Sequence, residues 1–308
     1  MKQSHPHLSL EELCGLFGVT RQAYYEAAAR AKTTTIAHMI VLTLVKDWRA
    51  NMPLLGTRKL FYLLQPELER HQIKMGRDQL FDLLGFHGLL VRRRKRLVKT
   101  TDSHHWLKKY PNLVKELVVD EPEQLWVSDL TYIRTMQGFS YLSLITDAYS
   151  RKVVGYSLYP TLEAVGCVLA LKMAIKHRKS ATDYVLIHHS DRGIQYCSAD
   201  YVALLEGDQI AISMTQSGSP YDNALAERVN GILKNEFFSK QIYQHHQEAE
   251  SEIRRAIACY NQKRPHASVD YLTPDQAHQQ SGTLKKRWKR YRRTPSSKQV
   301  ELTDPLMS

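Results

Sequence analysis

Three acidic residues stand at positions where a carboxylate calls for an explanation. Asp129 lies inside the run LWVSDLTYIRT (125–135), in which apolar side chains occupy both faces of a strand. An ionised group inside a strand that is buried on both faces costs several kcal/mol unless an opposite charge compensates it, and a metal ion is one such charge. Asp191 follows the apolar run DYVLIHHS, and Glu227 lies in the helical segment 222–238.

The chemistry open to these carboxylates depends on whether they converge. Carboxylate oxygens are ligands that Mg²⁺ prefers, and two such ions roughly 3.5–4 Å apart can activate a nucleophile and stabilise the leaving oxygen of a phosphodiester. Taken alone, each residue has a plainer interpretation. Asp191 suits a turn, and Glu227 points away from the apolar stripe of its helix, as a solvated residue would. Asp147, which opens a turn before Arg151, is interpreted as structural.

The segments that would position the carboxylates have the pattern of a mixed α/β unit. Runs rich in β-branched and aromatic residues predict an antiparallel meander of three strands, at 125–135, 140–150 and 151–160. Helices and strands then alternate, as helix 162–179, strand 183–190, helix 198–209, strand 210–216 and helix 222–238. This order predicts a five-stranded mixed sheet with helices on its faces. Asp191 and Asp129 would face each other if the fourth strand lies beside the first.

The N-terminal segment 9–30 has the pattern of two short helices. Its signals are a capping box, a glycine stop and a second cap, at Ser9 with Glu12, at Gly18 and at Thr20. The second helix begins with the polar residues Arg21 and Gln22. These are the parts of a helix-turn-helix that binds DNA, although an ordinary αα-hairpin has almost the same pattern.

A second helical pair is predicted at 57–89. Its first helix, 57–71, contains Pro66, which can kink or break it, and its second, 75–89, is opened by Gly76 and Arg77 and closed by Gly85. The pair leads directly into the basic run RRRKR, which begins with Arg92, Arg93 and Arg94. These three arginines and Arg77 are candidate DNA contacts.

The net charge of +12 is concentrated in two places. Residues 83–101 carry six lysines or arginines and no acid, and residues 284–300 carry eight and no acid. Such runs are the electrostatic footprint of a polyanion partner, and solvated basic linkers account for either run alone equally well. Neither run flanks an amphipathic or lipidated segment, so we expect no membrane partner. Four scattered cysteines without CxxC spacing indicate buried thiols in a reducing compartment.

Changes in composition divide the chain into five parts. We predict an all-α DNA-binding region that contains both helix-turn-helix candidates, a linker, a catalytic core, a helical extension of the core and a basic tail, at 1–96, 97–123, 124–240, 241–280 and 281–308.

The spacing between the three acidic residues, and from the last of them to a lysine, is distinctive. Sixty-one residues separate Asp129 from Asp191, thirty-five separate Asp191 from Glu227, and Lys234 follows seven positions after the glutamate. This resembles the DDE signature of retroviral integrases and related bacterial transposases. The motifs LWVSDLTYI, HHSDRGIQYCS, SGSPYDNALAERVNGILKNE and YNQKRPHASVDYLTPDQA resemble the third family of insertion-sequence transposases (IS-three). The resemblance spans about residues 37–279.

The resemblance implies a fold, a reaction and roles for particular residues. It implies an RNase H-like core in which Asp129, Asp191 and Glu227 bind metal and catalyse, with two Mg²⁺ ions or Mn²⁺ as the alternative cofactor. Lys234 would contact the transposon end, and Arg192 and Asn223 would help to position DNA. Water would cleave the element's end, and the freed 3′-OH would attack another phosphodiester directly, with no covalent protein intermediate. Relatives typically form a circular intermediate before they insert.

The same resemblance implies partners. They are double-stranded DNA, as terminal repeats and target, further copies of the chain on paired ends, and the upstream-frame helix-turn-helix product that many relatives need. Whether residues 1–96 replace that product stays open. The location implied is the bacterial cytoplasm, in association with the nucleoid.

Several features depart from the family pattern or stay open. RVN follows Glu227 where many members have Ser-Phe-Phe, and the zinc-binding domain of retroviral integrases is not visible in this sequence. His188 or His189 could lie near the metals or be a satisfied core histidine, and no task can be derived for His266. In the basic tail, Trp288 and Tyr291 could stack on DNA, or the tail could be a solvated segment.

Two alternative functions fit parts of the sequence. A non-catalytic, sequence-specific DNA-binding regulator is disfavoured by the intact carboxylates and Lys234. A stand-alone RNase H-type nuclease is disfavoured by the helix-turn-helix candidates.

Overall fold

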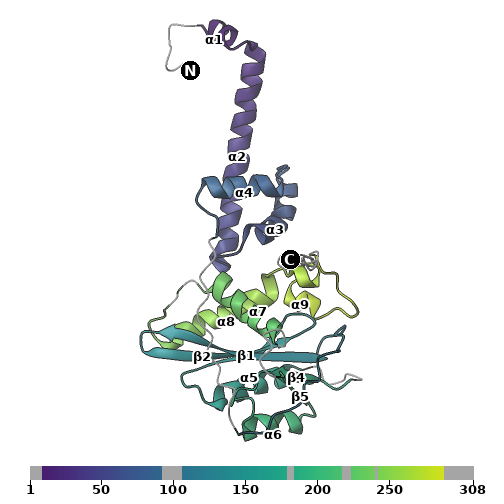
Figure 1. The fold of residues 1–308 in the computed structure, drawn as a ribbon. Coiled ribbons are helices and arrows are strands. Elements are labelled where there is room, and N and C mark those ends of the chain that lie inside the picture. Colours follow the sequence, from purple (N-terminus) through teal and green to yellow (C-terminus); the bar gives the residue numbers. More distant parts are fainter. Residues whose placement is uncertain are drawn as a thin grey trace, which may run out of the picture.

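The fold is described from a computed structural model that covers residues 9–91, 106–178, 184–216, 223–238, 240 and 242–287. A sheet with helices on both faces forms the body, and a helical region stands on one of its sides (Figure 1). Within the part of the chain described, no helix is both long enough and apolar enough to cross a membrane.

The sheet has the predicted composition and pairing. It consists of five strands in the order β3-β2-β1-β4-β5. Their bounds are β1 (Leu125–Thr135), β2 (Gly138–Asp147), β3 (Val153–Tyr159), β4 (Ile187–Ser190) and β5 (Ala211–Met214). The first three form the antiparallel meander, whereas β4 pairs in parallel with β1 and β5 in parallel with β4. The expected neighbourhood of the first and fourth strands is therefore confirmed.

Each face of the sheet is covered by its own set of helices. Helices α5 (Ala164–His177) and α6 (Ala199–Gly207) lie on one face, where they bury Trp126 of β1. Helices α7 (Ala224–Ile232), α8 (His246–Lys263) and α9 (Pro274–Ala277) lie on the other face (Figure 1). A π-helical turn, η1 (Leu233–Phe237), directly continues α7, and a 3₁₀ turn, η2 (Ala267–Val269), follows α8.

The helical region consists of α1 (Leu10–Leu16), α2 (Arg21–Asn51), α3 (Thr57–Arg70) and α4 (Arg77–Phe86). Both predicted N-caps are confirmed, since Ser9 and Glu12 form a capping box and the Thr20 side chain accepts from the backbone N–H of Ala23. The second helix of the 9–30 motif continues to Asn51, and its first half projects away from the body (Figure 1).

The helix predicted at 57–71 is confirmed as α3, which continues through Pro66. One other helix boundary differs from the expectation. Helix α4 contains Gly85, which was expected to close it, and ends at Phe86 instead. The glycine that follows the helix is Gly88, whose φ of 65° is a left-handed conformation that suits glycine after a helix end.

Buried polar groups and cysteines behave as structural residues. Asp147 is fully buried and accepts hydrogen bonds from the backbone N–H groups of Glu123 and Ser150, at 2.7 and 2.8 Å, so its structural interpretation is confirmed. All four cysteines are free and buried, as expected.

Candidate active site

Asp129 lies in the middle of β1 on the face that α7 covers. The side-chain amide of Asn230, on α7, donates to Asp129 Oδ2 at 2.7 Å, and the backbone N–H of Leu130 donates to Oδ1 at 3.0 Å. The carboxyl group is partly buried. Both of its oxygens are thus held by neutral donors, and the Asn230 contact was not expected from the sequence.

The pKa of Asp129 is raised to about 7. Burial is the largest cause, because it disfavours the charged form. The hydrogen bond from Asn230 opposes the rise, and the negative charges of Asp191 and Glu227 add to it. The three predicted carboxylates are therefore close enough to act on one another through their charges.

Asp191 follows the last residue of β4, at the carboxyl end of that strand. Because β4 runs parallel to β1, with His189 paired to Val127, this strand end lies beside the middle of β1. The backbone N–H of Gly193 donates to Asp191 Oδ1 at 2.9 Å. A Cβ atom at position 193 would also lie 2.9 Å from that oxygen, so a side chain there would push the Asp191 carboxylate out of this position.

Glu227 lies in the first turn of α7 and its side chain is exposed, as the helical pattern predicts. The start of α7 is fixed to β1 by Asn223, which is only 6% exposed and donates from its side-chain amide to the carbonyl of Ser128 at 2.9 Å. Asn223 therefore places the helix that carries Glu227, and its predicted DNA contact stays a prediction. Residue 222, at which the predicted helix 222–238 begins, lies outside the described residues.

Lys234 lies in the π-helical turn and is partly buried. Burial lowers the pKa of its ammonium group, and the negative charge of Asp129 opposes that change. The turn therefore brings the predicted lysine within electrostatic reach of the predicted carboxylates.

The comparisons with known proteins fit this geometry. Residues 119–220 match the family described as "Integrase core domain", and residues 208–274 match a second family of the same description. An insertion element IS600 protein of 31 kDa from Shigella sonnei is 34% identical over 85% of this chain and 96% of its own length. The transposase for insertion sequence IS629 of the same species is 30% identical over 74% of each chain. The chain belongs to the IS3 family of insertion-sequence transposases.

A solved structure of the HTLV-2 integrase catalytic core domain in complex with magnesium is also similar. It is 20% identical, covers 51% of this transposase and 97% of its own chain, and has a TM-score of 0.40. The strand order and the two integrase core matches together give the transposase the RNase H-like fold that was expected. As a member of this family, it is a polynucleotidyl transferase.

The residues present in the transposase suit a hard divalent cation. Across the described ranges, no three Asp, Glu, His or Cys side chains lie close enough together to hold a metal ion as they stand. Two observations nevertheless fit a bound metal ion. Asp129 is disfavoured in its charged form by burial and by two further carboxylates, and the buried Oδ1 of Asn230 beside it has no hydrogen-bond partner in the described structure. Oxygen ligands without thiolate or imidazole favour Mg²⁺ or Mn²⁺.

The histidines beside Asp191 are core residues. His188 is buried, and its Nε2 lies 2.6 Å from Ser128 Oγ and 2.9 Å from the Tyr201 hydroxyl oxygen. Burial lowers its pKa to about 3, so its ring is neutral near pH 7. His189 is also buried, with Nδ1 2.8 Å from Ser213 Oγ. His266, whose task was left open, is buried with its ring edge-on to Tyr260.

The other predicted DNA contacts lie in different parts of the transposase. Arg192 is partly buried next to Asp191. Arg21 and Gln22 stand in the first turn of α2, in the half that projects from the body (Figure 1). Arg77 opens α4 and pairs with Asp78. The predicted contacts in the two basic runs, Arg92, Arg93, Arg94, Trp288 and Tyr291, lie outside the described residues.

Glu236 is a half-buried charge that sequence reasoning missed. It lies in the π-helical turn, where Arg264 donates to its two carboxylate oxygens at 2.8 and 2.9 Å and Lys59 Nζ lies 3.0 Å from Oε1. The backbone N–H of Leu54 donates to the Glu236 carbonyl at 3.1 Å. Glu236 thus joins the helical region to the segment that carries Lys234. An acid directly before two phenylalanines, in NEFF, is the signal that could have indicated it.

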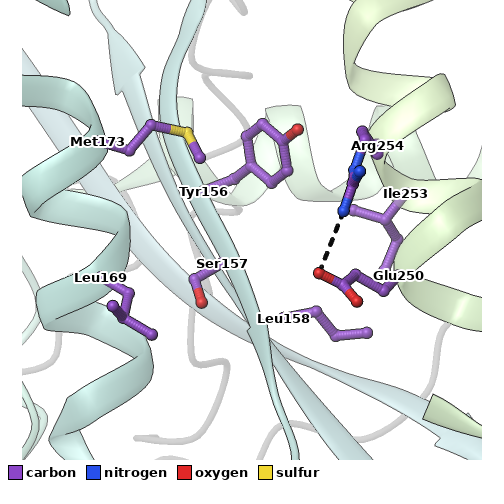
Figure 2. Close-up of a pocket in the computed structure, with 8 residues that line it drawn as sticks. All are labelled: Tyr156, Ser157, Leu158, Leu169, Met173, Glu250, Ile253 and Arg254. Carbon is purple, nitrogen blue, oxygen red and sulfur yellow. Dashed lines mark hydrogen bonds and ion pairs between the residues drawn. The ribbon is translucent and has the colours of Figure 1, made fainter. Parts of the chain in front are cut away.

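A pocket of about 310 Å³ lies away from the carboxylates. Figure 2 shows Tyr156, Ser157 and Leu158 of β3 between Leu169 and Met173 of α5 on one side and the Glu250–Arg254 ion pair of α8 on the other. None of the predicted site residues lines it.

Proposed function

We propose that Asp129, Asp191 and Glu227 are the catalytic carboxylates with which this transposase cleaves and joins DNA strands. The observation that carries the proposal is that Asp191 and Glu227, reaching the site from a neighbouring strand end and from a covering helix, both raise the pKa of the half-buried Asp129. A cation bound there would offset the negative charge of the three carboxylates.

The three carboxylates would hold Mg²⁺, with Mn²⁺ as the alternative, as a pair of ions. Bound ions of this kind lower the pKa of an attacking hydroxyl and stabilise the charge on the leaving oxygen. Asn230 would keep the Asp129 carboxylate in one orientation, and the Gly193 N–H would do the same for Asp191. Asn223 would hold the start of the helix that presents Glu227.

The reaction consists of two displacements at phosphorus. In the first, a water oxygen bonds to the phosphorus at the element's end, the bond from phosphorus to the 3′ oxygen breaks, and that oxygen takes up a proton. In the second, the freed 3′-OH loses its proton and attacks another phosphodiester, which releases a new 3′-OH. No bond forms between protein and DNA. Lys234, partly buried in the π-helical turn, would contact a phosphate of the element's end.

DNA recognition would come from the helical region and the basic runs. Arg21, Gln22 and Arg77 would contact the terminal repeats from α2 and α4, with Arg92, Arg93 and Arg94 binding phosphates. We further propose assembly of several copies on paired ends, cooperation with an upstream-frame product, and a place on the nucleoid in the bacterial cytoplasm.

The test is strand cleavage and joining on a labelled fragment that carries the element's terminal repeat. We expect joining with Mg²⁺, none with EDTA, and none with the Glu227→Gln variant. Joining that survives in Glu227→Gln would remove Glu227 from the catalytic set. End-specific binding without joining, even after the upstream-frame product is added, would favour the regulator and overturn the proposal.

A further inference from the structure

Residues 106–113, called here the strap, run along the outer edge of the sheet beside β5. Leu107 and Tyr110 pack against the apolar cluster under α5 and α6. The carbonyl of Pro111 accepts from the Met214 N–H at 3.2 Å, and the Leu113 N–H donates to Ser213 Oγ at 2.9 Å. The strap therefore has a fixed place on the core, although the sequence suggested only a linker there.

Ser213 of β5, to which the strap is hydrogen-bonded, also contacts β4. Ser213 Oγ, which accepts from the strap, also lies 2.8 Å from Nδ1 of His189. His189 is two residues before Asp191 on the chain. The strap is thus joined, through β5, to the strand whose end carries a proposed catalytic carboxylate.

The strap's other side chains face solvent. Trp106 is 90% exposed, and Lys108 and Lys109 are exposed beside it, with Lys108 Nζ 5.0 Å from the centre of the Tyr110 ring. Residues 106–115 contain no acid. A tryptophan exposed to water contributes nothing to the core. An exposed aromatic ring next to cations is a combination that binds nucleic-acid strands, because bases stack on the ring and the cations contact phosphates.

One cation of the strap, Lys109, lies in the same part of the core as Asp191. The thiol of Cys197, in the loop after β4, is within electrostatic range of both. Burial and the charge of Asp191 raise the pKa of this thiol, whereas Lys109 and Arg192 lower it. Lys109 therefore lies near the loop that contains Asp191 and Arg192.

We propose that the strap, together with Arg192, binds the DNA strand that leads into the carboxylates. Lys108, Lys109 and Arg192 contact its phosphates, and Trp106 stacks on a base that is unpaired next to the cleavage point. This inference rests on the proposed function, because it takes the carboxylates as the place of strand cleavage.

The first experiment measures equilibrium binding of element-end DNA by the full chain carrying Glu227→Gln, without divalent metal. Two substrates are compared, one fully paired and one with two unpaired bases at the cleavage point. We expect Trp106→Ala to weaken binding of the unpaired substrate by about 10-fold and of the paired substrate by less than about 2-fold. Trp106→Phe keeps an aromatic ring and is expected to restore most of the loss.

The second experiment measures how the binding constant falls with salt. The double variant Lys108→Gln with Lys109→Gln is expected to reduce the slope of log K against log [salt] by about 2, since each phosphate contact contributes roughly 0.9. The matched control is Lys172→Gln with Lys176→Gln, two exposed lysines of α5, which should leave the slope unchanged.

Three results would overturn the strap proposal: equal losses on both substrates with Trp106→Ala, equal slopes in the strap and control variants, or a changed oligomeric state with unchanged DNA binding. The last of these would make the strap a protein interface. Strand joining by the wild-type chain is followed in parallel. Joining that proceeds while the strap variants bind normally rejects the strap alone, whereas no joining by the wild type rejects the proposed function independently.

Discussion

Asp129 and Glu236 are two carboxylates whose pKa values are shifted in opposite directions. Asp129 contacts α7, and Glu236 lies in the π-helical turn that continues it. Glu236 lies between Arg264 and Lys59. Burial alone would raise its pKa, but these two cations outweigh that effect and the pKa is lowered. Among the described residues, Asp129 accepts hydrogen bonds from an amide and a backbone N–H, and two further acids raise its pKa with burial.

The charge of Glu236 is paired with cations within the fold, whereas the charge of Asp129 has no ion pair among the described residues. Glu236 is satisfied within the chain, and its partners come from α3 and from the end of α8, so it fixes the helical region to the catalytic segment. Asp129 lies within electrostatic reach of Lys234, and in the proposed function a bound cation compensates its charge. A substitution at each position should therefore have opposite effects on activity and stability.

The largest expected effect is on catalysis at the uncompensated carboxylate. Asp129→Asn should reduce strand joining by about 10³-fold or more, because a neutral amide is a poor ligand for a divalent cation, while the Kd for element-end DNA changes by less than about 2-fold. Single-turnover joining and equilibrium binding measure the two quantities. Glu206→Gln, an exposed acid of α6, is the control that should keep full activity. A modest loss in Asp129→Asn would mean that Asp129 is not a ligand.

The compensated carboxylate should instead matter for stability. Glu236→Gln leaves Arg264 buried without its counter-charge, so we expect the free energy of unfolding to fall by about 3–5 kcal/mol. Urea unfolding measures it. The control is Glu250→Gln, which breaks the exposed ion pair with Arg254 and should cost less than about 1 kcal/mol. Similar losses in both variants would show that the Glu236 contacts do not hold the helical region in place.

The strand and helix that carry Asp129 and Glu227 could be predicted from the sequence, but the π-helical turn and the contacts of Glu236 could not. The apolar runs are long and distinct enough to predict that Asp129 lies in a strand and Glu227 on an exposed helix face. The π-helical turn could not be predicted, because LKNEF continues the helical apolar period without a break. The Glu236–Arg264 pair joins side chains 28 residues apart, and no local pattern specifies such a contact.

Helix α2 and the strap differ in how much of their structure could be predicted from the sequence. No glycine or proline occurs between residues 19 and 52, so the continuation of α2 to Asn51 could have been predicted from the absence of a stop signal. By contrast, the strap could not have been distinguished from a free linker. Its attachment depends on β5, which lies about a hundred residues further along the chain.

The third prediction tests whether Asp129 is destabilised in its charged form. Its pKa is about 7 in the folded chain and near 3.8 when unfolded. Between these values the unfolded state releases the proton that the folded state keeps, so wild-type stability falls as pH rises from about 4 to about 7 and then levels. Asp129→Asn lacks this loss. We expect it to be more stable than the wild type by about 4 kcal/mol at about pH 8 and equally stable at about pH 4. A pH-independent difference in urea unfolding would contradict the assigned cause.

The smallest expected effect is the stabilisation of the wild type by a divalent cation. At ten times its Kd, Mg²⁺ should add about 1.4 kcal/mol to the free energy of unfolding, if it binds the folded chain alone. The cation competes with the proton at Asp129, so its affinity should rise as pH increases through about 7. Thermal unfolding with and without Mg²⁺, at about pH 6 and about pH 8, measures both effects. Asp129→Asn should show neither, whereas Glu206→Gln should behave as the wild type. An equal Mg²⁺ response in Asp129→Asn would place the cation elsewhere and leave the charge of Asp129 without the partner that its surroundings require.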